Sequence, residues 1–159
     1  MKLSTRGDYA VRALLELATE EDLDCMPLGD LAERTGIPRK YLEQILMRLR
    51  DARVVGAKRG AHGGYRLARP AAEITVGEVI RTMDGPLAPS LCASQTAHQP
   101  CPAYRCASEE ACVMRALWLD VREAISGILD HTTFGDLAER ERAQRAARSA
   151  APFVGSYQI

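Results

Sequence analysis

The feature that most constrains the fold is a pair of short amphipathic patterns separated by a tight break. Residues 28–34 place apolar side chains on one helical face, and a glycine then interrupts the pattern within residues 35–37. Pro38 follows at a position where a helix tolerates its missing N–H, and the second pattern runs to about residue 50. Two helices joined this way predict a helix-turn-helix unit, whose second helix enters the major groove of DNA. From this segment by itself, an αα-hairpin with a purely structural purpose is the alternative.

The N-terminal part of the second helix carries side chains that suit DNA. Arginine forks onto guanine, glutamine binds adenine and glutamate accepts from the amino group of cytosine, while cations also bind phosphates. The candidate DNA contacts on this helix are Arg39, Lys40, Tyr41, Glu43, Gln44 and Arg48.

A basic, glycine-rich hairpin is predicted directly afterwards. Residues 53–58 and 64–68 favour two short strands, and the glycines of residues 59–63 allow a close approach to another backbone. A basic hairpin after a helix-turn-helix is typical of a wing that touches the sugar-phosphate chain or the minor groove. The segment lacks the Gly-Lys-Ser/Thr sequence of a nucleotide phosphate loop. The candidate wing contacts are Lys58, Arg59, His62 and Arg66.

The charge distribution agrees with a nucleic-acid partner. Residues 34–69 contain ten Lys or Arg and two acidic residues, a net charge of +8, whereas the remaining chain carries −8. Phosphate contacts supply much of the attraction between proteins and DNA, so a local basic block suits a DNA reader. If charge were the only clue, a solvated basic face would be the preferred explanation.

Capping patterns delimit two further helices. Thr5 is expected to cap a helix over residues 5–19, with Asp8 as the acid three residues on. Thr75 and Glu78 form a second capping box, which opens a short helix that ends near residue 84.

Residues 111–130 carry the longest apolar stripe in the chain. Little protein is expected beside this helix to cover the stripe, so we expect it to pack on a two-fold mate. Thr133 and Asp136 predict a cap for a final turn or two. The predicted fold is mainly α with a small β-hairpin. It divides into a winged helix-turn-helix domain (1–83), a cysteine-rich loop (84–110), a dimerisation helix with a final turn (111–138) and a polar tail (139–159). The alternating charge of this tail is typical of a solvated helix or of a frayed or disordered segment.

Four cysteines lie within 21 residues of the loop, at Cys92, Cys101, Cys106 and Cys112. Thiolates gathered on one loop are soft ligands, which favour iron–sulfur clusters, zinc or copper(I). The chain has no apolar run long enough to span a membrane, and its start lacks the apolar core of a signal peptide. We therefore expect a cytoplasmic protein, in which clustered cysteines are more often ligands or redox thiols than disulfides.

As an ordered set, five segments resemble the Rrf2 family, and in particular its IscR- and NsrR-type iron–sulfur cluster regulators. The similar segments are residues 1–10, 41–46, 59–65, 75–80 and 112–118, and the likeness covers roughly residues 1–138. The resemblance implies a homodimeric winged-helix transcription factor that binds a partly palindromic double-stranded operator. It also implies a cluster on the cysteine loop, with 2Fe–2S preferred to 4Fe–4S, and a signal of cluster loss, nitrosylation or oxidation.

The resemblance implies three of the cluster ligands, which it places at Cys92, Cys106 and Cys112. In the IscR type the fourth ligand is a histidine three residues after the last cysteine, and here that position holds Arg115. The extra thiol of Cys101 is one substitute for that ligand.

Asp8 is the competing substitute, because it matches the position from which NsrR-type proteins donate a carboxylate across the dimer. From the residues alone, Asp8 is as readily a capping acid on Thr5. His98 in the loop is a third choice.

Two other interpretations remain open. The cysteines could form a structural zinc site or act as bare thiol switches, and either would keep the DNA binding. An enzyme or electron carrier is disfavoured, because an electron carrier needs no basic hairpin and the three histidines lie in unrelated contexts.

Overall fold

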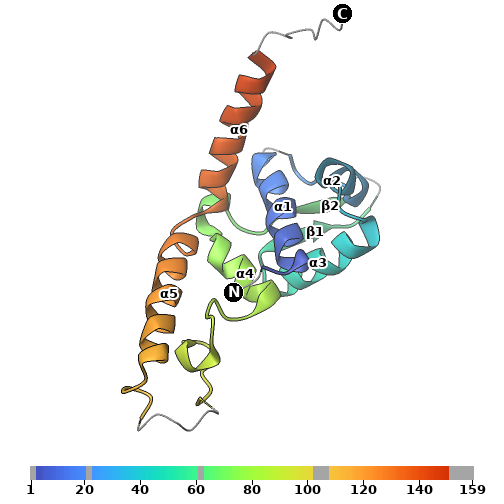
Figure 1. The fold of residues 1–159 in the computed structure, drawn as a ribbon. Helices are drawn as coiled ribbons and strands as arrows, with labels where there is room; N and C mark the ends of the chain where they lie inside the picture. The colour runs from blue at the N-terminus through green and yellow to red at the C-terminus, as the bar shows by residue number, and fades with distance from the viewer. Residues whose placement is uncertain (1–2, 21–22, 61–62, 102–107, 151–159) are drawn as a thin grey trace, which may run out of the picture.

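The computed structural model describes residues 3–20, 23–60, 63–101 and 108–150 (Figure 1). Within those ranges it contains six α-helices, two short 3-10 helices and one antiparallel two-stranded sheet, which confirms the mainly α class with a small β-hairpin. The elements are α1 (Thr5–Thr19), α2 (Leu28–Thr35), α3 (Arg39–Asp51), β1 (Val55–Lys58), β2 (Gly64–Leu67), η1 (Ala71–Glu73), α4 (Val76–Asp84), η2 (Leu91–Ala93), α5 (Val113–Leu129) and α6 (Phe134–Ala150).

The turn between α2 and α3 follows from one glycine. Gly36 closes α2 in the left-handed region, with φ of 68°, a conformation that costs glycine little. The side chains that α3 turns inward are fully or almost fully buried against α1 and α2, and they are Leu42, Ile45, Leu46 and Leu49. The apolar pattern of the sequence therefore fixes which face of α3 is left for solvent.

The hairpin is tied to the rest of the domain by a third stretch of extended chain. β1 and β2 pair from Val55 opposite Leu67 to Lys58 opposite Gly64. The backbone of Met26 exchanges two hydrogen bonds of 2.8 Å with Tyr65 in β2. A Cβ on Gly64 would lie 2.3 Å from the carbonyl oxygen of Met26, so only glycine fits there. His62 lies outside the described residues.

The cap of α1 differs from the expectation for Thr5. Ser4 is the N-cap, because its hydroxyl accepts a hydrogen bond from the Gly7 N–H at 3.1 Å. Ser4 also donates its own N–H to the Asp84 carboxylate at 2.9 Å, and its hydroxyl binds the same carboxylate. Asp84 is the last residue of α4, so the cap of α1 is built together with the start of the cysteine loop.

A junction at residues 130–134 fixes α6 to the domain. Thr133 and Asp136 cap each other reciprocally, as their spacing predicts. The Val76 N–H binds the carbonyl of Thr132 at 3.0 Å, and the Phe134 N–H binds the carbonyl of Ile74 at 2.9 Å. Phe134 is fully buried, so α6 begins inside the core.

The region expected as a polar tail differs in the structure. Instead of a final turn or two, α6 runs for 17 residues to Ala150, and residues 151–159 lie outside the described chain. Arg142 donates to the carbonyls of Ala18 and Thr19 at the end of α1, both at 3.2 Å. Arginines and carboxylates, which carry no hydrophobic periodicity, hold this helix in place.

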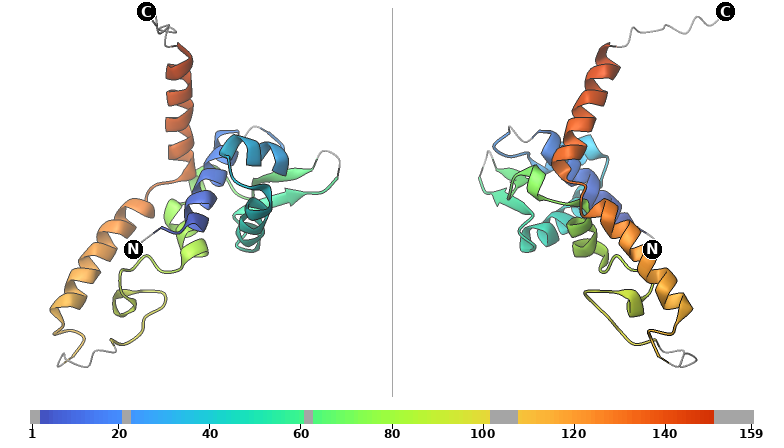
Figure 2. Two further views of the ribbon diagram at one scale, coloured as in Figure 1. Left: turned by 45° about the vertical axis from the view of Figure 1, so that its right-hand side comes forward. Right: turned by 90° about the vertical axis from the view of Figure 1, so that its left-hand side faces the viewer.

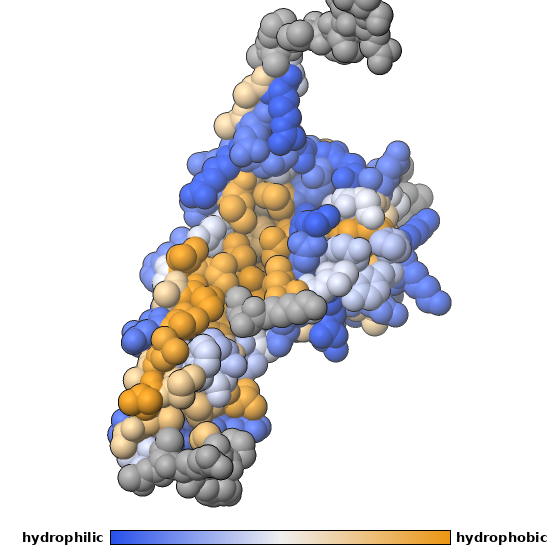
Figure 3. Space-filling model, viewed as in Figure 1, coloured by the Kyte–Doolittle hydropathy of each residue, from blue (hydrophilic) through white to orange (hydrophobic). Residues whose placement is uncertain are grey.

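α5 and α6 leave their junction in opposite directions (Figures 1 and 2). The hairpin projects from the side of the domain away from α5 (Figure 2). No residue of α5 is fully buried, and apolar side chains gather along it (Figure 3). Among the described residues, no helix combines the length and the apolarity needed to cross a bilayer.

Candidate DNA-binding surface and cysteine loop

One face of α3 presents every candidate contact that the sequence assigned to it. The side chains of this face are exposed, and they are Arg39, Lys40, Tyr41, Glu43, Gln44 and Arg48. The Tyr41 ring is held edge-on by the Tyr9 ring of α1, with 5.7 Å between the centroids. The face is thus polar and largely cationic, and it is held in place because the opposite, apolar face of α3 is buried.

The cations of the hairpin differ in whether they form an ion pair within the protein. Arg59 is exposed, whereas Lys58 and Arg66 both form ion pairs with Asp24. The hydrogen bond from Lys58 and its charge lower the pKa of the Asp24 carboxyl. Asp24 was not expected from the sequence, because it lies 34 residues before Lys58. Both cations are also exposed, so in contact with DNA they would divide their donors between Asp24 and phosphate.

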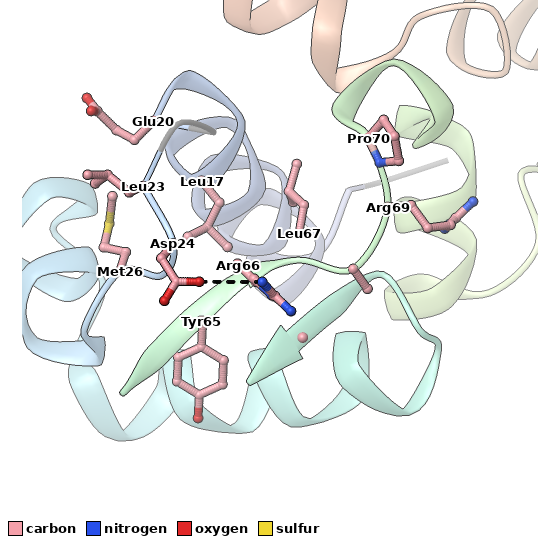
Figure 4. Close-up of a pocket in the computed structure, with 12 residues that line it drawn as sticks. Leu17, Glu20, Leu23, Asp24, Met26, Tyr65, Arg66, Leu67, Arg69 and Pro70 are labelled. Atoms are coloured by element: carbon pink, nitrogen blue, oxygen red, sulfur yellow. Dashed lines mark ion pairs between the residues drawn. The ribbon is translucent and has the colours of Figure 1, made fainter. Parts of the chain in front are cut away.

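A cavity of about 570 Å³ lies between the end of α1, the segment at residues 23–26 and the hairpin (Figure 4). Its wall combines apolar side chains such as Leu17 and Leu67 with the charged groups of Asp24 and Arg66. Arg66 reaches Asp24 across 3.6 Å in this wall. The base of the hairpin is therefore loosely filled on this side, and the Asp24 ion pairs and the Met26 pairing position it.

Other cations of the basic block also have partners within the domain. Arg34 binds Glu16 and Glu20 of α1, and Arg69 binds Glu78 of α4 at 2.6 Å. Glu16 is 9% exposed and also receives Arg145 of α6 at 2.7 Å. Arg34 joins α2 to α1, and Arg69 joins the segment after β2 to α4, so the charge count of the block exceeds the charge that its surface offers to DNA.

The cysteine loop is docked on the first turns of α5. Cys92 lies in η2, where its thiol is buried and 3.2 Å from the Ser90 hydroxyl. Arg115 donates its Nε to the carbonyl of Cys92 at 3.0 Å. Because Cys112 immediately precedes α5 and Arg115 lies in its first turn, the segment that carries Cys92 is held beside the start of this helix.

Further contacts order the rest of the loop. Arg122 donates to the carbonyl of Ala93 at 3.0 Å, and His98 pairs with Glu109 at 3.0 Å. Cys101 is half-buried, and Cys106 lies outside the described residues. Within the described part of the chain, no three Cys, His, Asp or Glu side chains already converge as a metal site.

Asp8 does not cap α1. Its carboxylate pairs with Arg12 one turn further along the helix at 2.9 Å, and 40% of its side chain is exposed. It lines an open hollow of about 470 Å³ on the N-terminal turns of α1, together with Leu3, Ser4, Thr5, Tyr9 and Arg12. Asp8 thus faces solvent in one copy of the chain.

Three comparisons place the chain among known proteins. A family model described as "Rrf2: Iron-dependent Transcriptional regulator" matches residues 3–140. The HTH-type transcriptional regulator IscR of Klebsiella pneumoniae (strain 342) is 36% identical over 141 residues, which span 89% of this chain and 82% of that protein. Among solved structures, the global cysteine regulator CymR of B. subtilis superposes with a TM-score of 0.72 at 34% identity, over 88% of this chain and 98% of CymR. T. potens IscR gives 0.68 at 32% identity, over 92% and 90%.

Proposed function

Because the chain belongs to the Rrf2 family of transcriptional regulators, we propose that it is a homodimer whose affinity for a DNA operator is set by an iron–sulfur cluster on the Cys92–Cys112 loop. Binding of DNA for regulation, rather than catalysis, is what the family membership establishes. The dimer, the cluster and the residues that contact each partner belong to the proposal. Its place of action would be the cytoplasm, where the operator is.

The exposed face of α3 is the observation that carries the DNA part. It offers two planar guanidinium groups, at Arg39 and Arg48, and the Gln44 amide to base edges or phosphates. Arg59 on the hairpin would add a backbone contact. In a two-fold dimer the two α3 helices would meet half-sites about 34–36 Å apart, or a multiple of that distance.

The donor set of the loop fits an iron–sulfur cluster. Cys92, Cys106 and Cys112 would hold it, and thiolates are the ligands that such clusters take. Arg115 of α5 binds the segment that carries Cys92, so this cysteine and Cys112 both lie near the start of α5. When bound, the cluster supplies a redox- and nitric-oxide-reactive centre. The residues of the chain would position the thiolates, and the ordering of the loop would affect α5.

The fourth ligand would be Cys101 or Asp8. Arg115, at the position of the histidine of the IscR type, is already bound to the Cys92 carbonyl and offers no lone pair. Cys101 belongs to the same loop, whereas Asp8, whose side chain is 40% exposed in its open hollow, would donate its carboxylate across the proposed dimer, as the resemblance to NsrR-type proteins implies. The spectra of Cys101→Ala and Asp8→Asn separate these two ligands.

A thiol switch or a zinc site is the second candidate. Staphylococcus aureus CymR, which is 36% identical and superposes with a TM-score of 0.66, has a structure described as an oxidized form, and this favours a switch that responds to oxidation. In this version the same loop would change its order on oxidation of the thiols, or zinc would hold it permanently.

Anaerobic purification followed by a visible spectrum and assays of iron, sulfide and zinc on one sample tests the proposal. Brown protein with equal iron and sulfide, whose DNA affinity changes when the cluster is removed, is the expected result. Protein that stays colourless after anaerobic reconstitution would refute the cluster and leave the thiol or zinc version.

A further inference from the structure

The side chain of Arg6 lies in an unusual place for an arginine in the first turn of a helix. It lines a hollow of about 150 Å³ between α1 and α3, together with Tyr41, Gln44, Ile45 and Arg48. Its Nε is buried, and among the described residues it has no hydrogen-bond partner. A buried N–H on a permanently charged group is costly to leave unpaired, so this arrangement favours a ligand that supplies the missing acceptor.

The lining of the hollow indicates the charge of that ligand. Two arginines, Arg6 and Arg48, line it, and the other lining residues Tyr41 and Gln44 carry further donor groups. No acidic residue belongs to this lining. By contrast, Arg12 on the same helix pairs with Asp8, and Arg34 pairs with Glu16. The hollow is therefore built for an anion.

The position and size of the hollow identify the anion. Tyr41, Gln44 and Arg48 belong to the exposed face of α3 that is proposed to enter the major groove. A volume of about 150 Å³ is well below the roughly 300–1,000 Å³ of pockets that hold metabolites or nucleotides. A single phosphate group fits this scale, and the backbone of the groove that receives α3 supplies phosphates at this face.

We propose that Arg6 and Arg48 clamp one backbone phosphate of the operator between the N-terminal end of α1 and the reading face of α3. Arg6 would act as a positioning contact, which fixes the register of α3 in the groove and carries no sequence information itself. The inference rests on the proposed DNA binding by α3 and adds a contact from a different helix.

The test measures DNA affinity as a function of salt. Parent protein, Arg6→Ala, Arg6→Lys and a control, Arg140→Ala, are titrated by fluorescence anisotropy at several KCl concentrations. Arg140 is exposed on α6, away from α3. One probe is a duplex that the parent protein selects from random-sequence DNA, and the other is the same duplex with its sequence scrambled.

Arg6→Ala is expected to weaken binding to both duplexes by about tenfold and to lower the slope of log K against log salt by about 0.9, as the loss of one phosphate contact does. Arg6→Lys should keep the slope, because lysine keeps the charge, and Arg140→Ala should match the parent protein. An unchanged slope for Arg6→Ala, or a loss confined to the selected duplex, would overturn the clamp.

A second arm alters the DNA. Single phosphates of the selected duplex are replaced by neutral methylphosphonates, and one position per half-site should weaken the parent protein but weaken Arg6→Ala no further. The absence of such a position would contradict the clamp, and Arg6→Gln replaces Arg6→Ala in this comparison if the alanine variant fails to fold. Stabilisation of the parent by inorganic phosphate alone, with an unchanged salt slope in Arg6→Ala, would reassign the hollow to free anions. A parent protein that selects no duplex from random-sequence DNA would instead refute the proposed function.

Discussion

At the scale of single residues, the availability of a cation to a phosphate depends on whether the cation already has a partner within the protein. Arg34 and Arg69 belong to the basic block in the sequence, yet each forms an ion pair with a carboxylate of a neighbouring helix. Arg6 lies outside that block, yet its Nε is without a partner among the described residues and it lines the hollow against α3. A count of charges finds the basic region of the chain but not the cations that a phosphate would meet.

Asp24 should lower the affinity for DNA. Its carboxylate neutralises Lys58 and Arg66 and would repel nearby phosphates. Asp24→Ala is therefore expected to strengthen binding to any duplex by about three- to tenfold, and to steepen the salt dependence by up to about two phosphate contacts. Anisotropy titrations at several salt concentrations measure both quantities. Asp51→Ala, which removes an exposed carboxylate at the end of α3, is the control, and an equal gain from both variants would contradict a specific role for Asp24.

Asp130 should stabilise the junction of α4 and α5 in a pH-dependent way. Its two oxygens accept hydrogen bonds of 2.6 and 2.7 Å from Arg81, and this interaction lowers the pKa of the Asp130 carboxyl. A carboxyl with a lowered folded-state pKa contributes stability above its ordinary pKa of 3.8, and the contribution is lost as pH falls through the lowered value.

Asp130→Asn should thus lower the free energy of unfolding by about 1 kcal/mol at pH 7, since the pair is about one-third exposed and screened by solvent. The difference from the parent protein should shrink below pH 3.8 and then disappear. Urea unfolding at a fixed protein concentration over a pH series measures this. Asp120→Asn, at an exposed position of α5, should show little effect, and a pH-independent difference for Asp130→Asn would contradict the ion-pair explanation.

The sequence predicts contacts between neighbours far better than contacts at long range. Spacing alone identified the Thr75 and Thr133 caps, because a capping residue and its acid are three residues apart. The same rule predicted Thr5 as the cap of α1, whereas the structure has Ser4 there. Ser4 binds the carboxylate of Asp84, which is 80 residues away and so is not visible in the local spacing. Asp24 was missed for the same reason.

At the scale of elements, hydrophobic periodicity identified α1 to α5 and failed for most of α6. The apolar side chains of α3 recur at helical spacing and are buried as expected, whereas α6 is attached beyond Ala138 by Arg142 and Arg145. Both arginines bind groups of α1, and one of those groups, Glu16, also binds Arg34 of α2. A polar helix of this kind shows in the sequence only as alternating charge, which is equally typical of a solvated tail.

The docking of the cysteine loop on α5 should depend on Arg115. Arg115→Ala removes the hydrogen bond to the Cys92 carbonyl, so the Cys92 segment should leave the start of α5 more often. Amide hydrogen exchange of residues 91–94 should accelerate by at least about fivefold, which corresponds to a loss of about 1 kcal/mol. A reconstituted cluster should also decay faster in air. Exchange and decay rates equal to those of Arg140→Ala would show that Arg115 does not hold the loop.

At the scale of the whole molecule, the loop and the DNA-reading face share a short structural connection. Asp84 ends α4 where the loop begins, and it binds both the N–H and the hydroxyl of Ser4. Ser4 caps α1, whose Tyr9 packs on Tyr41 of α3. A change in loop order can therefore act on α3 through α1 within one copy, while in the proposed dimer α5 would carry the same change to the other copy.

The α5 helix should join two copies through one stripe of side chains. Met114, Leu117, Val121, Ala124 and Ile128 follow one another at alternating steps of three and four residues, which is the spacing of a coiled-coil seam. Met114, Leu117 and Ile128 are 51%, 47% and 67% exposed in the single chain, and burial of each large apolar side chain contributes roughly 1.5–3 kcal/mol.

The double variant Leu117→Asp/Ile128→Asp should therefore raise the dimer dissociation constant at least 100-fold, measured by sedimentation equilibrium. Ala57→Asp, which adds a charge at an exposed position of β1, should remain dimeric. The monomer should keep the helical circular dichroism of the parent protein, because neither α5 side chain is buried in one copy, and it should bind a single half-site weakly. A double variant that remains dimeric would place the two-fold interface elsewhere.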